Sequence, residues 1–109
     1  MKDSLESEIL QEIASVGGSY GRKIEYCIAR IRRIKRALNY LKKRMEREKK
    51  IPKLSIRLIA SLRKQLNLYK EEALRNRYYL IIYREAIGLT NHRPVYEIYN
   101  IEKILEDEP

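Results

Sequence analysis

The fold is decided by residues 20–87, which read YGRKIEYCIARIRRIKRALNYLKKRMEREKKIPKLSIRLIASLRKQLNLYKEEALRNRYYLIIYREAI. Two runs in this stretch place mostly apolar residues at alternating intervals of four and three. The first run consists of Tyr20, Ile24, Cys27, Ile31, Ile34, Leu38, Leu41 and Met45. The second consists of Ser55, Ile59, Leu62, Leu66, Tyr69, Ala73, Asn76, Leu80, Tyr83 and Ile87. This spacing predicts a seam along one side of each helix, as in coiled coils.

Pro52 separates the two runs, because the residue before a proline is disfavoured in helical backbone. We therefore expect two long helices, 20–50 and 55–87, joined by a short turn. A short turn makes the helices fold back on each other, so that the seams pair, for example Ile24 with Leu80. The sequence thus predicts an all-α protein built on a long, antiparallel, coiled-coil-like two-helix hairpin.

Shorter helical segments are expected on both sides of the hairpin. Residues 3–18 are predicted to form a short acidic helix that ends at Gly17 and Gly18, with Ser19 capping the long helix that follows. Residues 91–109 are predicted to form a short helical segment with an acidic tail, packed at one end of the hairpin. The length of 109 residues favours a single domain covering the whole chain.

The second half of helix 55–87 is apolar on a further side. The residues concerned are Leu74, Tyr78, Ile81 and Ile82. A helix that is apolar on two sides has to be covered on both. The terminal segments can supply this cover, and so can a homodimer or another protein partner, so these four residues are candidates for protein interaction. Asn76, the polar seam residue expected opposite Cys27, favours a polar layer that fixes the helix register.

The charge is distributed unevenly along the chain. The net charge of +9 is the balance of +10 in residues 20–50, +5 in residues 51–88 and −3 at each end. A basic middle of this kind favours an acidic partner. The first residues, MKDSLESE, do not resemble a signal peptide, and the longest apolar run is far shorter than a membrane span. A cytoplasmic protein without membrane contact is therefore expected.

Residues typical of catalysis are scarce. His92 is the only histidine and Cys27 the only cysteine, which disfavours a zinc site or a Cys–His pair. Phosphate-binding and dinucleotide-binding glycine motifs are lacking. HEPN-type ribonucleases use an Arg and a His a few residues apart, but Arg84 and His92 are spaced more widely, and a capping role is favoured for His92. We expect no enzymatic activity, no cofactor, no metal and no small-molecule substrate.

The side of helix 20–50 that lies opposite the seam is basic over its whole length. We call it the outer stripe, and its members are Arg22, Tyr26, Ala29, Arg33, Arg36, Tyr40, Lys43, Arg47 and Lys50. The stripe contains no acid and spans roughly 42 Å at 1.5 Å per residue, about the length of 12 base pairs. Its cations suit phosphates, and its tyrosines suit bases or sugars.

A second row of cations is expected where the flanks of the two helices meet. We call it the basic groove, and its members are Ile28, Lys35, Lys42 and Lys49 on one helix and Arg63, Lys70, Arg77 and Arg84 on the other. Like charges at such positions are normally avoided. Three interpretations remain open: a solvated face, neutralisation by the chain's own acidic ends, or an anionic ligand.

These patterns predict a nucleic-acid-binding protein that contacts mainly the phosphate backbone of DNA or RNA, without sequence specificity. The candidate binding residues are Arg22, Lys23, Arg33, Lys35, Arg36, Tyr40, Lys42, Lys43, Arg47, Lys49, Arg63, Lys70 and Arg77. The alternative is a non-catalytic adaptor or accessory subunit that docks in a larger protein complex.

Overall fold

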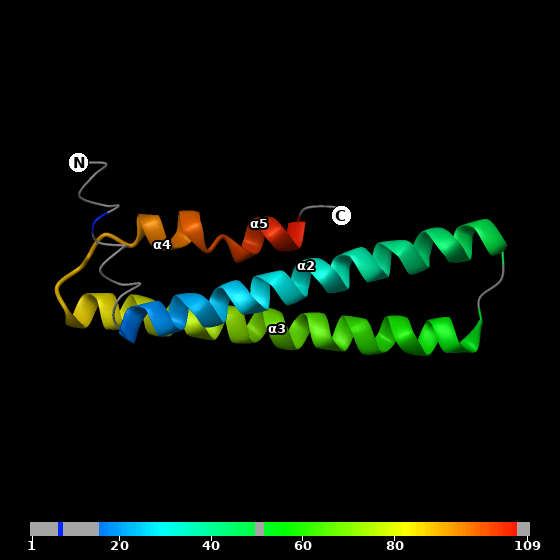
Figure 1. Cartoon of the computed structure of the whole chain (residues 1–109), viewed down its shortest axis with the longest axis horizontal. Coiled ribbons are helices and arrows are strands. Elements are labelled where there is room, and N and C mark those ends of the chain that lie inside the picture. Colours follow the sequence, from blue (N-terminus) through cyan, green and yellow to red (C-terminus); the bar gives the residue numbers. More distant parts are fainter. Residues whose placement is uncertain (1–6, 8–15, 50–51, 107–109) are drawn as a thin grey trace.

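The computed structural model describes residues 7, 16–49 and 52–106, and the regular structure in these ranges is entirely α-helical. The two long helices are α2 (Val16–Glu48) and α3 (Lys53–Ala86), and the two short ones are α4 (Arg93–Ile98) and α5 (Ile101–Glu106). The long helices lie antiparallel in an elongated molecule of 56 × 22 × 18 Å (Figure 1). The predicted all-α hairpin is confirmed.

The start of α2 differs from the prediction. The helix begins at Val16 and includes Gly17 and Gly18, so the expected helix end at these glycines and the cap at Ser19 are both wrong. A glycine inside a helix costs only about 1 kcal/mol, which tertiary packing can offset, and Gly18 is buried. The rest of the expected first helix, residues 3–15, lies outside the described residues except for Ser7, which is helical.

The hairpin turn is close to the predicted position. Lys49 adopts the left-handed conformation (φ 52°), and its N–H donates to the carbonyl of Met45 at 3.1 Å, which ends α2. Pro52 has an extended backbone (φ −63°, ψ 139°) and is the N-cap of α3. A proline suits this place because its missing N–H is not needed at the start of a helix.

The chain reverses again after α3. Gly88 has a φ of 91°, a backbone conformation that residues with a side chain rarely adopt. The N–H of Leu89 donates to the carbonyl of Arg84 at 2.8 Å, which closes the end of α3. His92 is then the N-cap of α4, and Pro94 lies in its first turn. The predicted C-terminal helical segment is therefore present as two short helices with a break at Tyr99 and Asn100.

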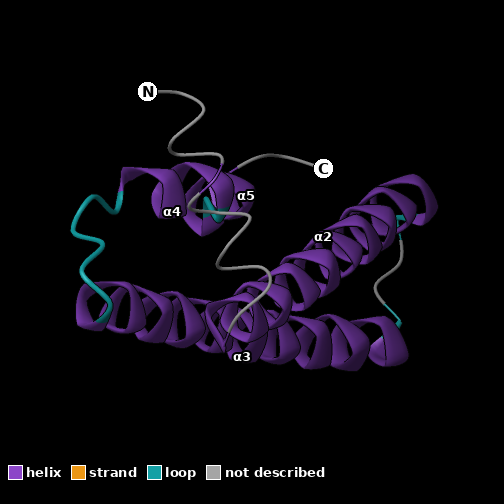
Figure 2. Cartoon of the chain, turned by 60° about the vertical axis from the view of Figure 1, so that its left-hand side comes forward, coloured by secondary structure: helices purple, strands orange, loops and turns teal. Residues whose placement is uncertain are grey.

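The two short helices run along one half of the hairpin, on one side of it (Figure 2). There they form a core with α2 and α3 that contains Ile24, Cys27, Ile28, Ala73, Leu80, Val95 and Ile101. Leu74 and Ile81 pack against this core, whereas Tyr78 and Ile82 are exposed. The second apolar side of α3 is thus covered in part by the C-terminal segment of the same chain.

In two contacts between α2 and α3, the α3 residue lies nearer the hairpin turn than the residue that the expected pairing places opposite its partner. The rings of Tyr20 and Tyr79 are 6.1 Å apart, and Arg30 donates to the hydroxyl of Tyr69 at 3.3 Å. Asn76 is buried, but its side chain donates to the carbonyl of Glu72 in its own helix at 2.9 Å.

Candidate nucleic-acid interface

The outer stripe is presented by α2 as one continuous exposed row. Every described member of it is solvent-exposed, from Arg22 to Arg47, while Lys50 lies outside the described residues. Because α2 is unbroken between Arg22 and Arg47, the row extends for roughly 38 Å. The local periodicity of the sequence is enough to produce this geometry, since it puts the seam on one side and the cations on the other.

The two tyrosines of the stripe have different surroundings. Tyr26 packs edge-to-face on Tyr69 of α3, with ring centroids 6.3 Å apart, and the Arg30 guanidinium lies 5.6–5.8 Å from both rings. Tyr40 lines a shallow, open depression together with Lys43, Glu46 and Arg47. Both tyrosines are 58% exposed, but the ring of Tyr26 is engaged by Tyr69 and Arg30, so Tyr40 is the better placed of the two for stacking on a base.

The basic groove is divided by the C-terminal helices. In the half that they cover, Lys35 donates to the carbonyls of Ile104 and Leu105, at 2.6 and 3.4 Å. These carbonyls belong to the last turn of α5, where a cation is favourable because the carbonyl groups there lack helical partners. Ile28, at the same flank, is buried in the core.

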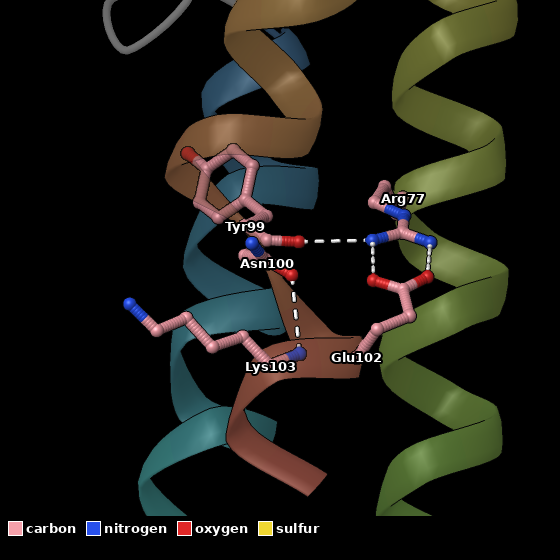
Figure 3. Close-up of polar contacts among 5 residues, drawn as sticks. All are labelled: Arg77, Tyr99, Asn100, Glu102 and Lys103. Carbon is pink, nitrogen blue, oxygen red and sulfur yellow. Dashed lines mark hydrogen bonds and ion pairs between the residues drawn. The ribbon is translucent and has the colours of Figure 1, made fainter. Parts of the chain in front are cut away.

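Arg77 is the centre of a polar cluster in the covered half (Figure 3). It forms a bidentate ion pair with Glu102, one hydrogen bond of which measures 2.8 Å, and it donates to the Tyr99 carbonyl at 3.0 Å. Its guanidinium also lies 4.8 Å from the ring centroid of Tyr96. The hydrogen bonds from Arg77 lower the pKa of Glu102 to about 2. In this position Arg77 is buried and unavailable to an external phosphate.

Neutralisation from within therefore applies to part of the groove, through Glu102 and the end of α5. The acids of the expected first helix lie outside the described residues, as does the acidic tail after Glu106. Sequence reasoning did not single out Glu102, whose role depends on where α5 packs. In the other half of the groove, Lys42, Lys49 and Arg63 are exposed and Lys70 is half-buried.

Arg84 and His92 occupy structural positions. Arg84 is fully buried and donates to the carbonyl of Asn91 at 2.8 Å, across the reversal between α3 and α4. His92 is the N-cap residue of α4, without a side-chain hydrogen bond to the helix, and its Nε2 lies 3.1 Å from a carboxylate oxygen of Glu85. Since Arg84 has no exposed surface, this pair does not form an open Arg–His site.

Other reactive groups are few in the described part of the chain. Cys27 is buried, and its pKa is raised mainly by that burial and further by the negative charge of Glu72, so the thiol stays protonated. Among the described residues, no three His, Cys, Asp or Glu side chains gather in a way that could hold a metal ion. None of the described helices has an apolar stretch long enough to cross a membrane.

The sequence matches no protein-family model and no curated protein, and the structure matches no solved structure.

Proposed function

We propose that the chain is a nucleic-acid-binding protein whose main contact surface is the outer stripe of α2. The observation that carries this proposal is a row of exposed cations, free of acids, on one face of a single 33-residue helix. The exposed groove residues Lys42, Lys49 and Arg63 extend the surface toward the turn. Lys35 and Arg77 are excluded from it, because both are engaged with the C-terminal helices.

Such a surface binds mainly through the phosphate backbone. Each cation that neutralises a phosphate releases a bound counterion, so the affinity falls steeply as the salt concentration rises. Phosphate contacts carry no direct sequence information, and the stripe has few groups able to read base edges. Tyr40 adds a stacking platform that favours a single strand or a duplex end.

The test is a fluorescence-anisotropy titration with labelled duplex and single-stranded DNA and RNA at several salt concentrations. The test variant carries Arg33→Gln, Arg36→Gln, Lys43→Gln and Arg47→Gln. The matched control carries Lys53→Gln, Arg57→Gln, Arg93→Gln and Lys103→Gln, which removes the same charge from exposed positions outside the stripe. Both proteins keep the hairpin seam, so circular dichroism should show equal helix content.

The stripe variant is expected to lose most of its affinity, and its salt slope should fall by about 1 for each phosphate contact removed. The control variant should lose less affinity, because its cations lie away from the proposed contact surface. Equal losses in both variants would reduce the effect to net charge and refute the stripe as the site. Absence of binding by the wild type at low salt would refute the proposal as a whole.

The alternative is an adaptor or accessory subunit, and the exposure of Tyr78 and Ile82 on α3 favours it. An adaptor of this kind would form a stable complex with its protein partner, and high salt would not dissociate it because the interface buries apolar surface. Size-exclusion chromatography with light scattering, without nucleic acid and with it, separates the two proposals. A gain in mass on addition of nucleic acid at low salt that is lost at high salt supports nucleic-acid binding, and no gain in mass favours the adaptor.

A further inference from the structure

A second stripe with regular spacing lies on an exposed face of α3, where Tyr79 also contacts α2 through the ring of Tyr20. It steps by four and three from Leu54 to Ile82, and all nine of its members are exposed. Its apolar members are Leu54, Leu58, Leu68, Tyr79 and Ile82. Leu54 is 77% exposed and Leu68 is 55% exposed, which is unusual for leucines aligned on one helix face. We call this row the α3 stripe.

The order of apolar and polar residues in the α3 stripe is the same in both directions. Two apolar residues are followed by two polar ones, then by Leu68, then by two polar and two apolar ones. Leu68 is therefore the centre of the pattern. A pattern of this kind matches itself when a second copy runs antiparallel, because the apolar end that begins with Leu54 meets the apolar end that finishes with Ile82.

The polar members of the stripe are compatible with the same arrangement. If a two-fold axis through Leu68 relates two copies of the chain, Ser61 of one copy lies opposite Arg75 of the other, and Gln65 lies opposite Glu72. No like charges meet in this arrangement. Along one border of the stripe it places Lys64 opposite Glu71, an opposite-charge pair that the symmetry produces twice. Charge and polarity therefore favour the same axis.

We propose that the chain forms a two-fold symmetric homodimer in which the α3 stripes of two copies pack antiparallel around Leu68. The stripe extends for roughly 42 Å, long enough for a helix-pair interface with apolar contacts at both ends and at the centre. Its formal charge is zero, since Glu72 balances Arg75, whereas the outer stripe of α2 carries only positive charge. A second copy suits the neutral face, and a polyanion suits the basic one.

This inference does not rest on the proposed nucleic-acid binding, because the two stripes lie on different helices. The dimer buries apolar residues and should persist in high salt, whereas phosphate contacts should not. Loss of one property in a variant can therefore be told apart from loss of the other.

The test is a charge swap on the two-fold axis, measured by sedimentation equilibrium on the full chain at micromolar concentration. Wild type is expected to be dimeric. Leu68→Glu and Leu68→Lys each bring two like charges together at the axis, so each should raise the dissociation constant about 100-fold or more. Mixing the two variants in equal amounts should restore a dimer, since opposite charges then meet. Simple loss of folding cannot produce that recovery.

The control is Ile56→Glu, which places the same charge on the same helix at an equally exposed position outside the stripe. It should leave the dimer intact. A wild-type chain that is monomeric at these concentrations overturns the proposal, and so does a dimer that survives Leu68→Glu. A mixture of the two Leu68 variants that stays monomeric overturns it as well.

A cysteine placed on the axis provides an independent geometric measurement. Leu68→Cys should form a disulfide-linked dimer under mild oxidation, because only a residue near the axis meets its own copy. The native Cys27 is buried and does not compete. Leu54→Cys should not cross-link to itself, but it should cross-link to Ile82→Cys when the two variants are mixed. Self-linking at position 54 that exceeds self-linking at position 68 would place the axis elsewhere and overturn the proposed arrangement.

Discussion

Arg77 and Glu102 show how one ion pair attaches the C-terminal segment to the hairpin. The Arg77 side chain is only 8% exposed and the Glu102 side chain 56% exposed, so the pair lies at the edge of the core. A guanidinium in this position needs acceptors, because a buried charge without partners is costly. The carboxylate of Glu102 and the carbonyl of Tyr99 supply them, and both belong to the segment that has to be held in place.

The depressed pKa of Glu102 predicts a pH-dependent loss of stability. The folded-state pKa is about 2, below the ordinary value of 4.5, so the contribution is present above about pH 4.5 and disappears as the pH falls toward 2. Because Glu102 is more than half exposed, solvent screening reduces this contribution to about 1 kcal/mol. Glu102→Gln should therefore lower the free energy of unfolding at pH 7, and the difference from wild type should vanish near pH 2.

Urea unfolding followed by circular dichroism between pH 2 and pH 7 measures this difference. Glu97→Gln is a suitable control, since its pair with Arg93 is exposed on both sides and should contribute little. A Glu102→Gln protein that is as stable as wild type at pH 7 contradicts the prediction. A difference that persists unchanged at pH 2 contradicts it too.

At the scale of elements, the link between α4 and α5 packs closely on the first part of α2. A Cβ atom added at Gly21 would overlap the hydroxyl of Tyr99 and would lie 3.2 Å from the ring carbon that bears it. Glycine at this place therefore lets the C-terminal segment approach the helix backbone. This requirement explains why a glycine is tolerated inside a long helix, where alanine would otherwise be preferred.

A double-mutant cycle at these two residues tests the close approach. Gly21→Ala alone should lower the free energy of unfolding by about 1 kcal/mol, because the new methyl group displaces the Tyr99 ring. In the Tyr99→Phe background the overlapping hydroxyl is gone, so the same substitution should become neutral or stabilise by up to about 1 kcal/mol through helix propensity. Chemical unfolding of the four proteins gives the coupling energy, and additive effects would show that the two residues do not interact.

At the scale of the whole molecule, burial is concentrated in one half of the hairpin. Among the described residues, the buried apolar side chains lie between Ile24 and Ile34, between Ala73 and Leu80, and at Val95 and Ile101. Toward the turn, the seam residues Leu38, Leu41 and Met45 are only partly buried. Among the described elements, the half without α4 and α5 is therefore stabilised only by the packing of α2 against α3.

Because burial of apolar side chains decreases toward the turn, we expect α2 and α3 to separate locally at the turn end first. Hydrogen exchange followed by mass spectrometry or NMR should show the slowest amides in residues 24–34 and 73–80. Amides in residues 38–48 and 53–62 should exchange at least about 10-fold faster, because local opening there exposes little apolar surface. The Leu68→Glu variant is the appropriate protein for this measurement, since dimer formation would protect α3. Uniform protection along both long helices would contradict the prediction.

Local spacing in the sequence was sufficient to predict the hairpin and the exposure of the outer stripe. The intervals of four and three decide which side of each long helix is apolar, and Pro52 decides where the chain turns, so both follow from residues close together in the chain. The cations from Arg22 to Arg47 are exposed for the same reason. These features do not depend on how the rest of the chain packs.

Only the tertiary structure decided which groove cations are accessible and where the first long helix begins. Lys35 and Arg77 are engaged by residues 69 and 25 positions further along the chain, and local periodicity says nothing about contacts over such distances. The helix continues through Gly17 and Gly18 although glycine disfavours helix locally, since tertiary packing can outweigh a propensity of about 1 kcal/mol. The placement of α4 and α5 on one side of the hairpin therefore determines which cations remain exposed in the groove.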